Sequence, residues 1–216
     1  RDRPVRKLGA AVPPVDVMPN GFDCPDDAAA TALRRPGISF VWVGRIAEEK
    51  RLDLAIEALS WLERGIDWTL DVSGPTYDPG SERRARRVVG ERGVDSRVHW
   101  WGQQTAPWAC VKPDFLLHTS STEGSPRVVA EAVFLGIPII ATDVGGIASL
   151  IAEGVGLLVD PDRVELLSAA LAEAVRRKGE LTQQAQAQRG ALPAMRWNVV
   201  AARYVELYEK ALAGRS

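Results

Sequence analysis

Short apolar segments alternate with helical segments along most of this 216-residue chain. Residues 38–43 form a nearly continuous apolar run that ends at Gly44, as expected of a buried strand. From about Lys50 apolar residues recur at the helical period, and Gly65 ends the predicted helix. The apolar face of this helix comprises Leu52, Ala55, Ile56, Leu59 and Leu62. Later apolar runs predict further strands at residues 68–72, 97–101, 114–118, 137–141 and 156–159.

Strands of this kind, separated by helices, predict an α/β fold with a parallel sheet covered by helices on both faces. Two later stretches, residues 162–178 and 197–213, also have a helical pattern. The opening stretch is rich in proline, alanine and charge and is interpreted as a linker or edge segment. We therefore divide the chain into a linker (1–36), a ligand-binding domain (37–192) and a final helix (193–216).

Composition excludes several classes of function. The 27 basic and 28 acidic side chains leave a net charge of −1, which argues against a general nucleic-acid binder or a polybasic membrane-surface protein. An apolar share of 46% excludes wholesale disorder, and no apolar run reaches the roughly 18 residues of a membrane-spanning helix. Two cysteines, Cys24 and Cys110, cannot build a disulfide framework, so we expect a cytoplasmic setting. The chain opens at Arg1, and we expect it to be part of a longer protein.

Small, polar or glycine-bearing segments follow the predicted strands. In an open parallel sheet the carboxyl ends of the strands share one edge, where backbone amides and helix amino termini bind ligands. Tight turns also favour glycine, so these segments alone leave a purely structural role open. The segments are Gly44-Arg45, Ser73 to Pro75, Gly102 to Gln104, Ser120 to Gly124 and Asp143 to Gly146.

Two carboxylates flank the start of a predicted buried helix. Ser125 is a good N-cap and Pro126 a good first helical residue, and the residues that follow are almost wholly apolar. Glu123 lies just before this helix and Glu131 on its second turn, about 8 Å farther along the axis. Acceptors on both sides of a helix amino terminus suit a ligand with hydroxyls at both ends and phosphate between them, such as a nucleoside diphosphate-sugar. The alternative is that Glu131 pairs with an arginine and Glu123 is a solvated loop residue.

A second candidate pair is basic. Arg45 and Lys50 follow the first strand and lie at the start of its helix, where two cations could clamp a diphosphate. The alternative is surface pairing with Glu48 and Glu49.

Taken in order, these segments resemble the carboxyl-terminal half of a retaining glycosyltransferase of the GT-B fold, from glycosyltransferase family 4 (group 1). The resemblance covers about residues 16–213 and is carried by an ordered set of short motifs. These motifs are Met18-Pro19-Asn20-Gly21-Phe22-Asp23, Val43-Gly44-Arg45 with Glu49-Lys50-Arg51, Val98 to Gly102, Ser121 to Pro126 through Glu131-Ala132, Gly136-Ile137-Pro138 to Ile147, Gly156 to Val159, and Trp197 to Ala213.

The resemblance implies a Rossmann-like domain and a role for each matching residue. Arg45 and Lys50 would neutralise the diphosphate of the donor, which becomes the leaving group. Glu123 would hold the transferred sugar, and Glu131 would accept hydrogen bonds from the ribose. The remaining residues implied for the donor site are Gly44, Gly102, Gln103, Gly124, Ser125, Pro126, Arg127 and Val128, with the base read by backbone near Gln103 and Gln104.

The resemblance further implies a UDP- or GDP-linked hexose as donor, no metal and no cofactor, and front-face attack that retains the anomeric configuration. In this family an amino-terminal domain supplies the acceptor site, so the chain alone would bind donor without turnover. The final helix would pack back toward that domain, and any contact with the inner face of the membrane would come through it. A GT-B-like sugar-nucleotide epimerase and a non-catalytic nucleotide-binding module remain as alternatives.

Three other patterns are interpreted as structural. Asp160-Pro161-Asp162 resembles an Asp-x-Asp metal motif but falls where turn chemistry is expected. His99 and His118 lie within strand patterns, and His118 is also a weaker candidate for contact with Glu123. The arginines of residues 83–87 predict a solvated helix face rather than a nucleic-acid site.

Ala148-Ser149 stands where the family often has Pro-Glu, which leaves the identity of the donor sugar open.

Overall fold

The computed structural model describes residues 18, 20–22, 33–104, 107–151, 155–189 and 195–213. Most of the expected linker at 1–36 and the cysteine at position 24 lie outside these ranges.

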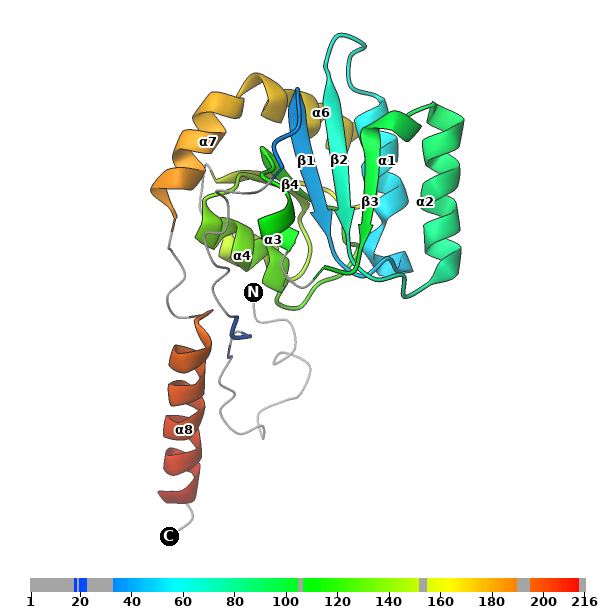
Figure 1. Ribbon diagram of the computed structural model, residues 1–216. Helices are drawn as coiled ribbons and strands as arrows, with labels where there is room; N and C mark the ends of the chain where they lie inside the picture. Colours follow the sequence, from blue (N-terminus) through cyan, green and yellow to red (C-terminus); the bar gives the residue numbers. More distant parts are fainter. Residues whose placement is uncertain are drawn as a thin grey trace.

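Six parallel strands form one sheet in the order β3-β2-β1-β4-β5-β6 (Figure 1). The order therefore reverses between β1 and β4, which are hydrogen-bonded neighbours. The strands are β1 Ile38–Val43, β2 Trp68–Ser73, β3 Val98–Gly102, β4 Phe115–His118, β5 Ile139–Thr142 and β6 Gly156–Val159. The α/β class with a parallel sheet is confirmed, and each predicted strand is present with its ends displaced by two residues at most. The largest displacement is at β5, which begins after Pro138 because proline has no N–H to donate to the ladder.

Helices cover both faces of the sheet (Figure 1). On one face pack α1 Leu52–Ser60, α2 Pro79–Arg92 and α6 Val164–Arg176. On the other pack α3 Pro107–Cys110, α4 Arg127–Leu135 and α5 Ile147–Leu150. A hydrophobic core lies on each face of the sheet. Helix α7 (Lys178–Ala187) contributes Leu181 to the core under α1, α2 and α6, and Ala185 to the core under α3, α4 and α5. Short 3-10 turns, η3 Glu48–Lys50 and η4 Asp95–Arg97, precede α1 and β3.

Successive side chains of a strand pack alternately into the two hydrophobic cores. In β1, Phe40 and Trp42 pack under α1 while Val41 packs under α4. Phe40 stacks on Phe115 of β4, with ring centroids 5.5 Å apart. This contact joins β1 and β4, so the point where the strand order reverses is also a fully buried part of the core.

The predicted start of α4 is wrong by one residue. Pro126 is the N-cap, with φ −73° and ψ 105°, and no side chain caps the helix. Because that ψ is extended, Pro126 cannot be the first helical residue and Ser125 cannot be the cap. The amides of the first turn consequently have no side-chain partner.

Helix α8 (Trp197–Ala213) extends away from the sheet (Figure 1). Phe22 connects the start of α8 to α4. Its backbone N–H donates to Met195 O, just before α8, at 2.9 Å, and its ring packs edge-on against Phe134 of α4. Along its length only Val200 is buried. The exposed apolar side chains of α8 are Trp197, Tyr204, Val205, Tyr208 and Leu212. Among the described helices, none combines the length and apolarity needed to cross a membrane.

Candidate active site

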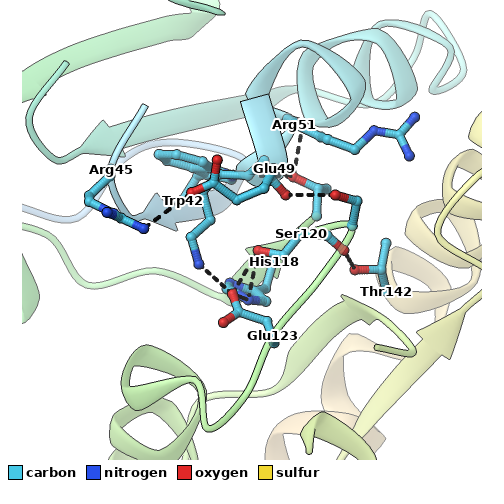
Figure 2. Close-up of polar contacts among 11 residues, drawn as sticks. Trp42, Arg45, Glu49, Arg51, His118, Ser120, Glu123 and Thr142 are labelled. Carbon is cyan, nitrogen blue, oxygen red and sulfur yellow. Dashed lines mark hydrogen bonds and ion pairs between the residues drawn. The ribbon is translucent and has the colours of Figure 1, made fainter. Parts of the chain in front are cut away.

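The loops after β1 and β4 lie together at the carboxyl edge of the sheet. Thr119 Oγ1 lies 2.9 Å from the carbonyl of Lys50 and 3.0 Å from that of Arg51, and Ser121 N donates to Glu49 O at 2.8 Å. The indole N–H of Trp42 in turn donates to Thr119 Oγ1 at 3.2 Å. These bonds hold η3, which carries Lys50, against the segment that carries Glu123 (Figure 2).

Glu123 is held through one of its two carboxylate oxygens. Oε1 contacts Lys50 Nζ and accepts from Ser120 Oγ at 2.7 Å, while His118 Nε2 lies 2.8 Å away. A carboxylate can only accept, so Nε2 carries the proton in this contact. Among the described residues, none bonds Oε2. The side chain is 10% exposed, so the alternative of a solvated loop residue is wrong.

The surroundings of Glu123 keep it ionised. Burial raises the pKa of Glu123, but hydrogen bonds from His118, Lys50 and Ser120 more than offset this, and the pKa falls to about 2. At neutral pH the side chain is therefore an anion whose charge is partly balanced by Lys50.

Arg45 and Lys50 have different environments. Arg45 donates from Nη2 to Glu49 Oε1 at 3.1 Å, and its guanidinium lies 4.9 Å from the centroid of the Tyr77 ring. This is the surface pairing that the sequence left as an alternative, whereas Lys50 is mostly buried and pairs with Glu123. An exposed pair such as Arg45–Glu49 contributes at most about 1 kcal/mol, so Arg45 can be recruited by an anion at little cost.

Glu131 lies on α4 and both of its oxygens are engaged. Arg127 Nε donates to Oε1 at 2.7 Å, and the indole N–H of Trp108 donates to Oε2 at 2.8 Å. The pairing with an arginine that the sequence allowed is therefore present. No contact among the described residues joins Glu131 to the Lys50–Glu123 pair.

The loop after β5 packs on the backbone of Glu123 and Gly124. Gly146 N donates to Gly124 O at 3.2 Å. Gly145 has φ +57°, and a Cβ there would lie 1.7 Å from the carbonyl oxygen of Glu123. Only glycine fits this close approach, so the glycine pair fixes the backbone in front of α4.

Further glycines converge at the same edge of the sheet. Gly44 N donates to Ser73 O at 2.9 Å, and Gly74 N donates to Gly102 O at 2.8 Å. Gly44 thus begins the loop that carries Lys50, and Gly102 lies beside the loop after β2, on the same edge of the sheet. Gln103 follows directly on Gly102, at the end of β3.

Three residues near the site were missed from the sequence, whereas Ser120 was predicted only as part of the segment Ser120 to Gly124. Thr119, Tyr77 and Trp108 act through contacts between distant segments, and Trp108 is 23 positions from its partner Glu131. His118, the weaker candidate, is a direct partner of Glu123.

The Asp160–Asp162 segment forms a turn, as predicted. Asp162 N donates to Asp160 Oδ1 at 3.1 Å, and Asp162 Oδ1 pairs with Arg51 at 2.8 Å. Within the described ranges no three His, Cys, Asp or Glu side chains are grouped so that they could hold a metal ion.

Comparison with known sequences identifies relatives. The profile of the family described as glycosyl transferases group 1 matches residues 26–190. A lipopolysaccharide 1,6-galactosyltransferase of Escherichia coli is 33% identical over 152 residues, which are 66% of this chain and 41% of that protein. A D-inositol 3-phosphate glycosyltransferase of Jonesia denitrificans is 29% identical over 72% of this chain and 38% of its own length. The chain thus spans about two fifths of these relatives.

Comparison with solved structures identifies the same fold. Sucrose-phosphate synthase from Thermosynechococcus elongatus superposes with a TM-score of 0.79 at 24% identity, over 97% of this chain and 56% of that one. Anabaena HepE in complex with UDP gives a TM-score of 0.73 at 21% identity, over 90% of this chain and 57% of that one. At these identities the superpositions show the fold alone. The family profile confirms the resemblance inferred from the sequence motifs, and the chain belongs to the glycosyl transferases group 1 family.

Proposed function

We propose that this chain is the donor-binding half of a retaining glycosyltransferase, which transfers a hexose from a nucleoside diphosphate-sugar to an acceptor. The observation that carries the proposal is the ionised Glu123, whose Oε1 is fixed by three side chains while Oε2 is left for a ligand. It lies beside the uncapped amino terminus of α4 and at the edge where the strand order reverses, the usual ligand position in such sheets.

The diphosphate would bind between η3 and the start of α4. The backbone N–H groups of Gly124, Ser125, Arg127 and Val128, with the positive end of the helix dipole, favour an anion there; Pro126 has no N–H to donate. Lys50 is already in place, and Arg45 would exchange Glu49 for phosphate. The nucleoside would lie against the backbone of Gly44, Gly102 and Gln103.

The two carboxylates would hold the two ends of the donor. Oε2 of Glu123 would accept from a hydroxyl of the transferred sugar. Glu131 would accept from the ribose, since each of its oxygens has a lone pair beyond those used by Arg127 and Trp108. The bound UDP of HepE and the galactosyl transfer named for the E. coli relative support a nucleotide-linked hexose, with UDP or GDP as the nucleotide.

Charge develops as the bond between sugar and diphosphate breaks. The sugar becomes positive and the leaving diphosphate gains negative charge, which Arg45, Lys50 and the α4 amides would stabilise without a metal or other cofactor. Loss of either cation should cost on the order of 3 kcal/mol of transition-state stabilisation. A pKa of about 2 makes Glu123 a permanent anion near the positive sugar rather than an acid catalyst. Attack from the face that the diphosphate leaves would retain the anomeric configuration.

The acceptor site would lie outside this chain. Because the chain spans about two fifths of its curated relatives, we expect it to bind donor without turning it over. We infer a cytoplasmic enzyme that reaches the membrane, if its acceptor is there, through the other domain.

The proposal is tested by titrating UDP, GDP and ADP into the purified chain by calorimetry and thermal melting. One of them should raise the melting temperature, and Arg45→Ala should weaken its binding while the exposed Arg83→Ala on α2 does not. If no nucleotide binds, the donor-site proposal fails. A full-length protein that interconverts nucleotide sugars without an acceptor would instead establish the epimerase alternative.

A further inference from the structure

A cavity of about 460 Å³ opens at the opposite edge of the sheet from the candidate active site. Its walls include Pro113 and Asp114, just before β4, and Pro138, just before β5. Helix α7 and the end of α4 close the remaining sides. The volume is that of a small-molecule site, and nothing in the proposed donor chemistry uses it.

The described wall of this cavity is strongly basic. It contains four cations, Arg34, Lys112, Lys178 and Arg189, and one acid, Asp114. Asp114 is already engaged, since Oδ2 accepts from Ser39 N at 2.9 Å and Oδ1 lies 2.8 Å from Lys178 Nζ. Lys178 is paired with Asp114 and Arg189 has a partner of its own, so Arg34 and Lys112 supply the excess of positive charge that favours an anionic ligand.

Apart from Thr182 and Gln186, the rest of the described wall is apolar. Trp108, Leu135 and Ile137 line it together with two prolines. A free inorganic anion would satisfy the cations but leave this surface uncovered. The combination suits a phosphate attached to an apolar or aromatic body.

Trp108 connects this cavity to the candidate active site. Trp108 lines the cavity, while its indole N–H donates to Oε2 of Glu131. Helix α4 makes a second connection, because Leu135 at its end lines the cavity and its uncapped start faces the candidate site. A ligand that moves Trp108 therefore acts on the residue assigned to the ribose.

We propose that this cavity is an effector site for an organic phosphate, with the phosphate on the basic wall and the apolar body against Trp108. Binding at the cavity is independent of the proposed function, whereas its effect on donor affinity rests on that function.

The test uses phenyl phosphate as probe, with inorganic phosphate and phenol as its two separated halves. The double variant Arg34→Glu/Lys112→Glu reverses two exposed charges of the wall, and Arg83→Glu/Arg87→Glu makes the same change on α2 as the matched control. We expect phenyl phosphate to bind more tightly than either half. The wall variant should lose at least about tenfold in affinity through lost charge-assisted contacts, and the control should lose none. No binding at about 10 mM, or equal affinities of the two variants, would overturn the proposal.

The coupling is read separately by NMR from the indole N–H of Trp108, assigned with Trp108→Phe. Phenyl phosphate should shift this resonance and change the affinity for whichever nucleoside diphosphate binds. A bound probe that leaves the indole resonance in place overturns the effector role. If phenyl phosphate binds and no nucleotide does, the cavity site stands and the proposed function fails.

Discussion

The ammonium group of Lys50 contacts the carboxylate of Glu123 across 73 positions of sequence. Lys50 follows β1 and Glu123 follows β4, the two strands between which the order reverses. The pair therefore exists only because the sheet places these strands side by side, and both side chains are largely buried. Its contribution to folding can be separated from any role in binding.

Replacement of Lys50 by methionine tests that contribution. Lys50→Met keeps most of the apolar stem and leaves Glu123 buried with only neutral donors. We expect the free energy of unfolding at pH 7 to fall by about 2 kcal/mol, measured by urea denaturation.

Arg45→Ala should behave differently, because the Arg45–Glu49 pair is exposed. Its free energy of unfolding should stay within about 0.5 kcal/mol of the parent chain. Nucleoside diphosphate affinity should nevertheless fall by about tenfold through loss of a charge-assisted contact. If Lys50→Met and Arg45→Ala lowered the free energy of unfolding equally, the result would contradict the different burial of Lys50 and Arg45.

The pKa of Glu123 predicts how stability responds to acid. The folded value, about 2, lies below the ordinary 4.5, so between these values the unfolded state binds more protons. The stabilisation by this carboxylate, on the order of 3 kcal/mol, is complete above pH 4.5 and is lost as pH falls toward 2.

Comparison with Glu123→Gln isolates this effect. The difference in free energy of unfolding between the parent chain and Glu123→Gln should be constant from pH 6 to 8 and should shrink in acid. The exposed Glu165→Gln on α6 is the control and should follow the parent at every pH. A titration midpoint above 4 for the Glu123 carboxyl, measured by carbon NMR, would refute the assignment.

The strands and the family were predictable because both depend on local patterns. The nearly continuous apolar run of β1 and the glycines after the strands are visible within a few residues of sequence. Charged pairs within one segment, such as Arg45–Glu49, were among the predicted alternatives, but the partner of Lys50 was not, because it depends on the order of strands in the sheet. The alternative interpretation of the sequence paired Lys50 with its neighbours Glu48 and Glu49, but in the structure Lys50 contacts Glu123. Trp108 gave no signal at all, since its bond to Glu131 joins two separate helices.

Gly145 offers a backbone test of the site. Gly145→Ala puts a Cβ within 1.7 Å of the Glu123 carbonyl oxygen at a positive φ, so the loop must move. We expect a loss of about 2 kcal/mol or more in the free energy of unfolding, together with weaker nucleotide binding. Gly90→Ala in α2 is the matched control, because its Cβ would meet nothing within 4 Å. The free energy of unfolding of Gly90→Ala should rise by about 0.5–1 kcal/mol, the usual difference between alanine and glycine in a helix.

Helix α8 provides the last test, which concerns the boundary placed at residue 193. Its apolar side chains are exposed along the helix, Tyr208 to 64%, while Val200 is fully buried. If α8 packs back onto another domain, Tyr208 becomes buried only in the full-length protein. Tyr208→Ser should then leave the melting temperature of this chain unchanged and lower that of the full-length protein by several degrees. Val200→Ala should destabilise both forms by about 1–2 kcal/mol, because its burial needs no other domain. A Tyr208→Ser variant with no effect in either form would show that α8 stays uncovered, and the expected packing of α8 would be wrong.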